Sequence, residues 1–232
     1  MFRDRLDAAT QLVERLRPIV PQGALILGVP RGGVPMGRVL ARALDADLDV
    51  VLVRKIPAPG NPEYAIGAVN EGGELFVSNE NAARYGDHYL QRAARDQAAL
   101  LRQRRERYTP ARVPVDPAGR FVVVVDDGSA TGATMETALR MVRQRGPARL
   151  VAALGAAPTQ VVQSLGALAD EVHCLVTASD FGSVGQFYAD FGQVSDDEVV
   201  ALLRDSMNTH PGEGAPGAGR ASPGATSEPA KR

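Results

Sequence analysis

Short aliphatic runs alternate with segments of helical periodicity along most of the chain. The runs span residues 24–29, 49–53, 121–125, 149–154 and 171–176. Strands that are apolar on both faces are typical of a parallel sheet, because helices cover both of its sides. Right-handed crossovers then give a doubly wound arrangement. The pattern therefore predicts an α/β fold with a mainly parallel five-stranded sheet flanked by helices.

The two ends of the chain carry different patterns. One helical face near the start carries Leu6, Ala9, Val13 and Leu16, which predicts an amphipathic helix. Residues 208–232 contain no Leu, Ile, Val, Phe or Met. Such a segment buries too little apolar area to offset its ordering entropy. We therefore expect one domain over residues 1–207 and a disordered tail over 208–232.

Residues 56–110 interrupt the alternation of strands and helices. They begin with Pro, Gly and Asn around two short strand patterns, at 65–69 and 74–78, and end in a helix from about His88 to Tyr108. An insertion of this length between core strands is typical of a flap or hood over a site. We expect residues 56–73 to form the flap, with Asn61 or Glu63 reaching inward.

Composition and charge narrow the class of protein. The chain has 232 residues, of which 44% are hydrophobic, and a formal net charge of -1. The whole molecule is therefore attracted neither to nucleic acid nor to an anionic membrane. The arginines at 92, 95, 102, 104, 105 and 107 lack interleaved aromatic residues, so we interpret them as a solvated helix face. A single cysteine, Cys174, and the absence of a leader or spanning run predict a cytoplasmic protein.

Unusual residues follow three of the predicted strands. They are Pro30-Arg31-Gly32-Gly33, Arg54-Lys55, and the stretch from Asp126 to Thr134. In an open parallel sheet, ligands bind outside the carboxyl ends of the strands, near the point where strand order reverses. We expect the three groups to lie on one rim and to form the site.

The stretch DDGSATGAT (126–134) has the chemistry of a sugar-phosphate cradle. Gly128 and Gly132 allow close backbone approach and positive φ. Successive amides at the start of a helix form an anion site that the helix dipole strengthens. Asp126 and Asp127 would repel that phosphate, so they are expected to face sugar hydroxyls or a hydrated metal ion.

This stretch resembles the phosphoribosyl-pyrophosphate (PRPP) signature of the type I phosphoribosyltransferases. Both have a hydrophobic strand, two acids, small residues, Thr-Gly, a small residue and Thr. A weaker resemblance spans about Phe2 to Leu203, and it includes PRGG as the pyrophosphate loop. The layout is closest to a group of predicted phosphoribosyltransferases that share Arg-Lys followed by APGNPE, and a late segment similar to FYADFGQVSDDEV.

The resemblance implies a role for each residue of the DDGSATGAT stretch. Asp126 and Asp127 would hold the 2- and 3-hydroxyls of the ribose. The 5-phosphate would be bound by Ser129, Ala130, Thr131, Gly132, Ala133 and Thr134. Mg²⁺ would be held mainly through PRPP and water, so no metal ligand of the protein's own is implied.

The resemblance also implies the pyrophosphate contacts. Arg31, Gly32 and Gly33 would bind pyrophosphate through open backbone amides, in a loop whose peptide is often cis. Arg54 and Lys55 would neutralise pyrophosphate as it leaves. Fixed cations and amides aimed at developing charge are the largest lever available for this chemistry.

The predicted function is transfer of phosphoribosyl from PRPP to a nucleobase-like acceptor, with release of pyrophosphate. The alternative is a PRPP-sensing regulatory protein of the same fold that binds RNA or DNA. A phosphosugar hydrolase is a weaker third interpretation, because no residue is placed to activate water. Members of the family are commonly dimers, which implies a homodimer here.

The acceptor stays open at this point. Ala130 occupies the position of a third acid that protonates the base in the hypoxanthine–guanine branch, which argues against a 6-oxopurine. The late segment, residues 180–192, is expected to form a hood with part of 56–110. Its aromatic residues are Phe181, Phe187, Tyr188 and Phe191. They would either stack on a planar base or pack the hood onto the sheet.

Overall fold

A five-stranded parallel sheet forms the centre of the protein. The computed structural model describes residues 1–110 and 114–209, with the side chains of 62–64, 79 and 206–209 left aside. The strands are β1 (Leu25–Gly28), β2 (Asp47–Val50), β6 (Phe121–Gly128), β7 (Arg149–Pro158) and β8 (Glu171–Ala178), in the order β2-β1-β6-β7-β8. The predicted fold class is confirmed.

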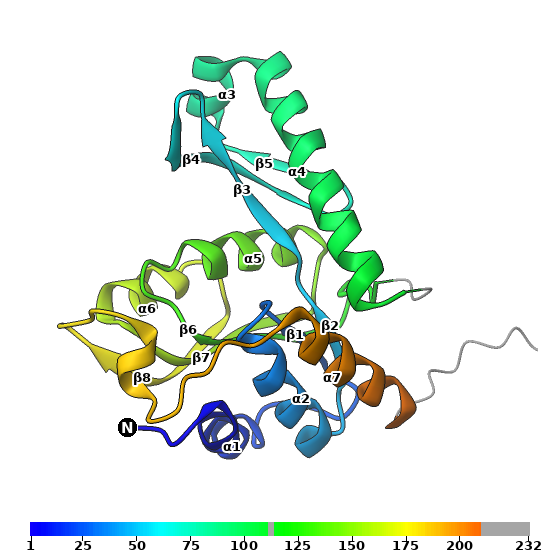
Figure 1. Ribbon diagram of the computed structural model, residues 1–232, viewed down its shortest axis with the longest axis vertical. Helices are drawn as coiled ribbons and strands as arrows, with labels where there is room; N and C mark the ends of the chain where they lie inside the picture. The colour runs from blue at the N-terminus through cyan, green and yellow to red at the C-terminus, as the bar shows by residue number, and fades with distance from the viewer. Residues whose placement is uncertain (111–113, 210–232) are drawn as a thin grey trace, which may run out of the picture.

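Helices cover both faces of this sheet (Figure 1). One face packs against α1 (Arg5–Leu16), α2 (Gly33–Leu44) and α7 (Asp196–Thr209), and the other against α5 (Ala133–Gln144) and α6 (Thr159–Leu165). Alternate residues of β6 belong to different cores: Val123 to the first and Val122 to the second. This explains why the strand is apolar at every position.

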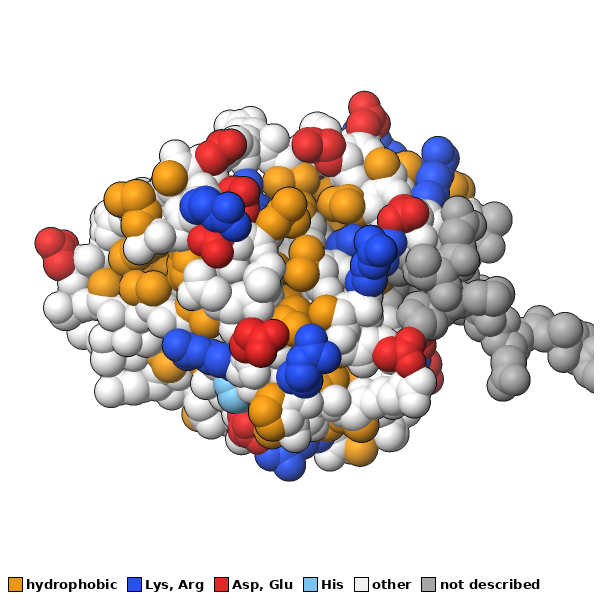
Figure 2. Space-filling view, turned by 90° about the horizontal axis from the view of Figure 1, so that it is seen from below, with side chains coloured by type: hydrophobic (Ala, Val, Ile, Leu, Met, Phe, Trp, Pro, Cys, Tyr) orange, Lys and Arg blue, Asp and Glu red, His pale blue; other side chains and the backbone are white. Residues whose placement is uncertain are grey.

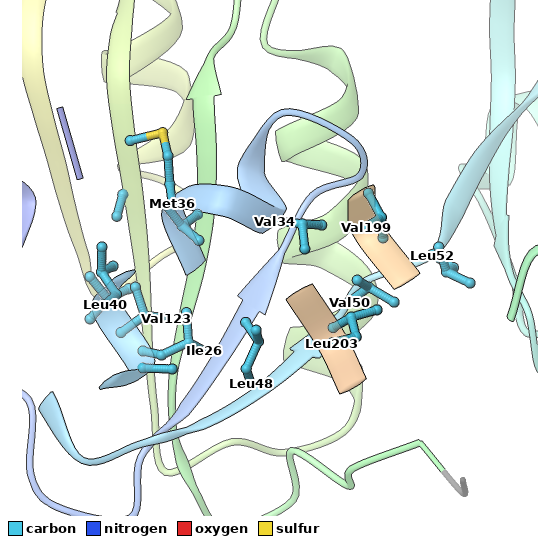
Figure 3. Packing of buried hydrophobic residues seen from close by; sticks show 14 of the residues in the cluster. Ile26, Val34, Met36, Leu40, Leu48, Val50, Leu52, Val123, Val199 and Leu203 are labelled. Carbon is cyan, nitrogen blue, oxygen red and sulfur yellow. The ribbon is translucent and has the colours of Figure 1, made fainter. Parts of the chain in front are cut away.

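The first core joins α2 and α7 to the edge of the sheet. In Figure 3, Met36 and Leu40 of α2 lie near Ile26 of β1, while Val199 and Leu203 of α7 lie near Val50. On the side seen from below, Lys, Arg, Asp and Glu side chains mix with hydrophobic ones, without a field of one sign (Figure 2). A face of this kind gives no broad electrostatic attraction to nucleic acid.

A second, antiparallel sheet and two helices stand apart from this body (Figure 1). The strands are β3 (Val53–Ala58), β4 (Asn61–Asn70) and β5 (Leu75–Val77), and the helices are α3 (Asn79–Tyr85) and α4 (Asp87–Tyr108). We call residues 53–108 the cap. The predicted insertion at 56–110 is therefore present, but it begins at Val53.

This earlier start corrects the predicted second strand. Residues 49–53 are not one strand, because β2 ends at Val50 and β3 begins at Val53 in the other sheet. Val51 and Leu52 between them are buried, so the apolar run continues through the crossing. Arg54 and Lys55 consequently belong to the first strand of the cap.

Ion pairs fasten the cap to the body. Arg105 of α4 lies 2.6 Å from Asp49 of β2 in the body, and it also lies 2.8 Å from Glu71, which follows β4 within the cap. Arg107 lies 3.0 Å from each of Asp196 and Asp197 of α7. The interpretation of the arginines as a solvated face is wrong for Arg105, because its side chain is nearly buried.

The amphipathic helix predicted near the start of the chain is present as α1. In α1, Ala8, Ala9, Leu12, Val13 and Leu16 are buried, whereas Leu6 is 55% exposed. The helix is thus confirmed, but its buried face is centred on Leu12 and excludes Leu6.

Helix α7 continues to Thr209, past the predicted start of the tail, and residues 210–232 lie outside the described part. Among the described helices, none is long and apolar enough to cross a bilayer.

The single cysteine lies at the edge of the main sheet. Cys174 lies on the edge strand β8, is half-buried, and donates from Sγ to the carbonyl oxygen of Val176 at 3.1 Å. Burial raises the pKa of its thiol to about 11. A thiol of that pKa is a poor nucleophile, which agrees with a structural role. The neighbouring His173 contacts Glu171 at 2.9 Å.

Candidate active site

The site lies where the strand order of the main sheet reverses. From β1 the chain crosses to β2 on one side, whereas β6, β7 and β8 follow one another on the other side. Gly28, the last residue of β1, is the register partner of Val125 near the end of β6. The loops that leave these two strands are therefore neighbours, as a doubly wound sheet requires of its binding crevice.

The PRGG loop lies directly on the end of β6. A Cβ atom added at Gly33 would fall 2.2 Å from the carbonyl oxygen of Val125, and one added at Gly32 would fall 2.0 Å from Oδ2 of Asp127. Only glycine permits this approach. The peptide bond between Pro30 and Arg31 is cis, as the family resemblance implies.

One of the predicted pyrophosphate amides is already occupied. The N–H of Gly33 donates to the carbonyl oxygen of Val29 at 2.9 Å. This bond closes the turn that leads into α2. The expectation of an open amide is therefore wrong for Gly33. The amides of Arg31 and Gly32 have no acceptor in the part of the chain that the structure describes, so they remain available to an anion.

The loop after β6 forms an anion site at the start of α5. Gly132 has φ of 78°, in the left-handed region, and its N–H donates to Oγ of Ser129 at 3.0 Å. The first helical hydrogen bond runs from the N–H of Glu136 to the carbonyl oxygen of Gly132. The amides of Ala133 and Thr134 precede that bond and point out of the helix end, where a phosphate gains from both hydrogen bonds and dipole.

Ser129 and Gly128 support this loop. Ser129 is buried, and its N–H donates to the carbonyl oxygen of Ala156 at 3.0 Å. Gly128 does not adopt positive φ, contrary to the sequence prediction; a Cβ there would fall 2.6 Å from the same oxygen of Ala156. Both residues thus hold the loop against β7, and the amides of Ala130 and Thr131 have no acceptor among the described residues.

The cap brings the predicted cations to this loop. Arg54 and Lys55 are exposed and line a cavity of about 390 Å³ together with Pro57, Gln97 and Thr134. Two of the three predicted rim groups therefore meet across the gap between β3 and α5. Arg31, from the third group, lies 3.9 Å from Asp196 of α7.

The two acids of the motif have different surroundings. Asp126 is half-buried, and its Oδ1 accepts the N–H of Asp127 at 2.9 Å. Asp127 is only 8% exposed, and its Oδ2 accepts from Nε of Arg5 at 2.7 Å. Asp127 is therefore covered by α1 and by the hood segment, residues 180–192.

Burial shifts the titration of both acids. It raises the pKa of Asp126, and the neighbouring Asp127 carboxylate raises it further. Burial also raises the pKa of Asp127, while the hydrogen bond from Arg5 opposes the rise. Strong perturbation of neighbouring carboxyl groups in a cleft is typical of functional sites.

The aromatic residues of the hood segment divide into two groups. Tyr188 is buried; its hydroxyl donates to the carbonyl oxygen of Asp127 at 2.6 Å, and its ring stacks on Phe191 at 4.9 Å. These two therefore pack the hood onto the sheet. Phe181 and Phe187 are half-buried, with ring centres 4.9 Å apart, and stay candidates for stacking on a base.

Sequence reasoning missed two residues of this region. Arg5 gave no local signal, since a charged residue in an amphipathic helix is ordinary. Gln97 did give one: it falls among the apolar residues of α4, where a polar side chain needs a partner. No partner for its side chain lies among the described residues.

Comparison with known proteins agrees with this geometry. Residues 8–191 match the family described as the phosphoribosyl transferase domain. The chain belongs to the phosphoribosyltransferase family. The crystal structure of TT1426 from Thermus thermophilus, 49% identical in sequence, covers 88% of this chain and 98% of its own, with a TM-score of 0.81. The recognition made from the Asp126–Thr134 stretch is confirmed.

Two curated family members from Mycobacterium tuberculosis are also similar. Proteins from strains CDC 1551 / Oshkosh and ATCC 25618 / H37Rv, both named as inferred phosphoribosyl transferases, are 43% identical over 208 residues, or 88% of this chain. Only 46% of each relative is covered. This phosphoribosyltransferase domain thus spans about half the length of these relatives.

Proposed function

We propose that the chain transfers the phosphoribosyl group of PRPP to a nucleobase-like acceptor and releases pyrophosphate. The observation that carries the proposal is the shared cavity of Arg54, Lys55 and Thr134. It sets two cations of the cap against the anion site at the start of α5. A ligand with a phosphate at one end and a larger leaving anion at the other suits this arrangement.

The residues divide the substrate between them. The amides of Ala130, Thr131, Ala133 and Thr134 would bind the 5-phosphate, since that of Gly132 already donates to Ser129. The carboxylate of Asp126 would accept hydrogen bonds from the ribose hydroxyls. The amides of Arg31 and Gly32 would bind the pyrophosphate. Hydrogen bonds to charged groups are each worth about 1.5–3 kcal/mol, so a few of them hold such a substrate firmly.

The reaction breaks the bond between C1 of the ribose and a pyrophosphate oxygen, and forms a bond from C1 to a nitrogen of the acceptor, which loses a proton. Positive charge develops on the sugar while negative charge grows on the leaving group. Arg54 and Lys55 are placed to stabilise the leaving charge, which is the most effective use of fixed cations.

Magnesium belongs to the proposal through the substrate. Asp126 offers a carboxylate that could accept hydrogen bonds from water on the ion, and Mg²⁺ usually keeps several such waters. When bound to the phosphate oxygens, the ion would offset part of their charge.

The acceptor is proposed to be planar and nitrogen-containing. Phe181 and Phe187 offer rings near the end of β8, where a base could stack. Ala130 stands at the position where a third acid would protonate the acceptor. The lack of a carboxylate at this position disfavours an acceptor that needs such a proton. A homodimer also stays an expectation.

The regulatory alternative has less support. Arg105, one of the arginines that raised it, is nearly buried in an ion pair with Asp49 of the body, so it is not free to bind nucleic acid. A PRPP sensor also has little need for cations aimed at a leaving group.

The deciding experiment measures pyrophosphate release from PRPP and Mg²⁺ with a panel of nucleobases. Release that depends on one of them supports the transferase. PRPP binding without release, together with an RNA or DNA gel shift that responds to PRPP, would favour the regulator. No binding of PRPP at all would reject both.

A further inference from the structure

Arg5 connects the acidic motif to the hood segment. Its Nε donates to Oδ2 of Asp127 at 2.7 Å, and the two side chains are only 13% and 11% exposed. Its Nη1 donates to the carbonyl oxygen of Gly192 at 2.7 Å. Its guanidinium also lies 4.0 Å from the centre of the Phe191 ring. A single side chain from α1 thus contacts both the acidic motif and the hood segment.

Asp127 is enclosed on its other side by the PRGG loop. A Cβ atom added at Gly32 would fall 2.0 Å from Oδ2 and 3.0 Å from Oδ1 of Asp127, so both carboxylate oxygens lie against the backbone of that loop. The carbonyl oxygen of Asp127 receives the Tyr188 hydroxyl. A carboxylate held in this way connects the loop, α1 and the hood, and it offers little access to a sugar.

Asp126 lies beside it with a different set of contacts. Among the described residues, its carboxylate accepts only the amide of Asp127, and it has no ion pair. Its second oxygen is left for a ligand. The two adjacent carboxylates of the motif therefore differ in ion pairing and in exposure: Asp127 is 8% exposed and paired with Arg5, whereas Asp126 is half-buried and has no such pair among the described residues.

We propose that Arg5 is a positioning residue of the phosphoribosyl site, which holds Asp127 as a brace between the PRGG loop and the hood and leaves Asp126 to receive the ribose hydroxyls. The proposal rests on the proposed function, since it concerns the same site. Arg5 also reduces the local charge of the pair from two negative charges to one. Repulsion of the phosphate groups of PRPP is reduced accordingly.

The pairing has a consequence for pH dependence. Asp127 is faced by Asp126 from its own strand, by Arg5 from α1 and by the phenol of Tyr188 from the hood, while Glu198 of α7 faces Arg5. Loss of the cation leaves two adjacent carboxylates without a neutralising partner, which favours uptake of a proton by the pair. PRPP binding should then weaken at a higher pH than in the unaltered chain.

The test is calorimetric titration with PRPP and Mg²⁺ from mildly acidic to mildly alkaline pH. Arg5→Met should weaken PRPP binding by about tenfold to a hundredfold, the range for a lost hydrogen bond to a charged group. It should also shift the loss of affinity on the acidic side to a higher pH. Arg5→Lys should return that loss to the pH seen in the unaltered chain, because the positive charge is restored. Arg3→Met is the matched control, since the Arg3 side chain is 84% exposed. If Arg5→Met fails to fold, Arg5→Gln carries the same comparison.

Double variants show through which acid Arg5 acts. The losses of affinity in Arg5→Met and Asp127→Asn should overlap almost completely, whereas those of Arg5→Met and Asp126→Asn should overlap less, because Arg5 donates to Asp127 and not to Asp126. Additive losses with Asp127, or an Arg5→Met variant that binds PRPP as the unaltered chain does at every pH, would overturn the inference. If the unaltered chain itself fails to bind PRPP, the proposed function fails first, and that result requires no variant.

Discussion

Arg105 of the cap places its guanidinium 2.6 Å from the carboxylate of Asp49, whose side chain is 1% exposed. The same carboxylate accepts the amides of Val50 at 2.7 Å and Val115 at 2.9 Å. Asp49 thus joins the edge of the main sheet, the cap and the chain that returns to β6. A charge buried so completely depends on its partner.

Arg105→Met should destabilise the protein strongly, because it leaves the Asp49 charge buried and unpaired. Breaking a buried pair by removing one partner costs about 3–5 kcal/mol. Urea unfolding checks the value, and Arg143→Ala, which breaks the exposed pair with Asp170, is the control and should cost much less. Recovery of stability in Arg105→Met with Asp49→Asn would confirm the cause. Equal losses of unfolding free energy in Arg105→Met and Arg143→Ala would contradict it.

Gly33→Ala should disrupt the site more than Gly32→Ala does. The added methyl at position 33 meets the carbonyl oxygen of Val125 in the middle of the sheet, whereas at position 32 it meets the side chain of Asp127. Backbone in a central strand cannot move aside, but a side chain can rotate at some cost. Melting temperatures rank the two variants. Gly192→Ala, with open space around its Cβ out to 3.8 Å, is the control, and a reversed ranking would refute the argument.

Tyr188→Phe should lower the free energy of unfolding by about 1–3 kcal/mol, the cost of leaving a buried acceptor unsatisfied. The lost hydroxyl donates to the carbonyl oxygen of Asp127. Tyr85→Phe is a suitable control, since the Tyr85 hydroxyl has no hydrogen-bond partner within residues 1–110 and 114–209. Identical unfolding curves for Tyr188→Phe and the unaltered chain would show that water replaces the phenol.

Lys55→Met and Arg54→Met should each lower the turnover number with PRPP more than they raise its KM, because both cations act on charge that grows in the transition state. The expected loss is about a hundredfold or more, as for other single groups aimed at such charge. Steady-state pyrophosphate release measures it, with the exposed Arg92→Met as control. A change confined to KM would instead mean that the cations only bind the ground state.

Asp126 should make the protein less stable as pH rises. Burial and the charge of Asp127 raise its pKa above the usual carboxyl value. The folded state therefore binds the proton of this carboxyl group more tightly than the unfolded state does. The stabilising contribution of Asp126 is complete below about pH 4 and is lost as pH rises through the raised pKa. Thermal unfolding across this range should give a flatter dependence for Asp126→Asn. An unchanged slope would show that the carboxyl titrates normally.

Much of the fold and the centre of the site could be predicted from local pattern. The apolar runs around Val123 and Leu154 report burial on both faces, and the order of residues from Asp126 to Thr134 specifies an anion loop without further context. The crossing at Leu52 could not be found, because an apolar run looks the same when the chain changes sheet. Arg5 was hidden for another reason. Its partner Asp127 is 122 positions away, and no local pattern records which distant charges meet.

The start of the cap at Val53 means that Arg54 and Lys55 travel with β3 and not with the main sheet. Any outward movement of residues 53–108 would remove from the site both the cations that stabilise the leaving group and the cover that excludes solvent. Substrate held in the open form would then be safe from wasteful cleavage, because assembly of the reactive centre and its enclosure would be a single event.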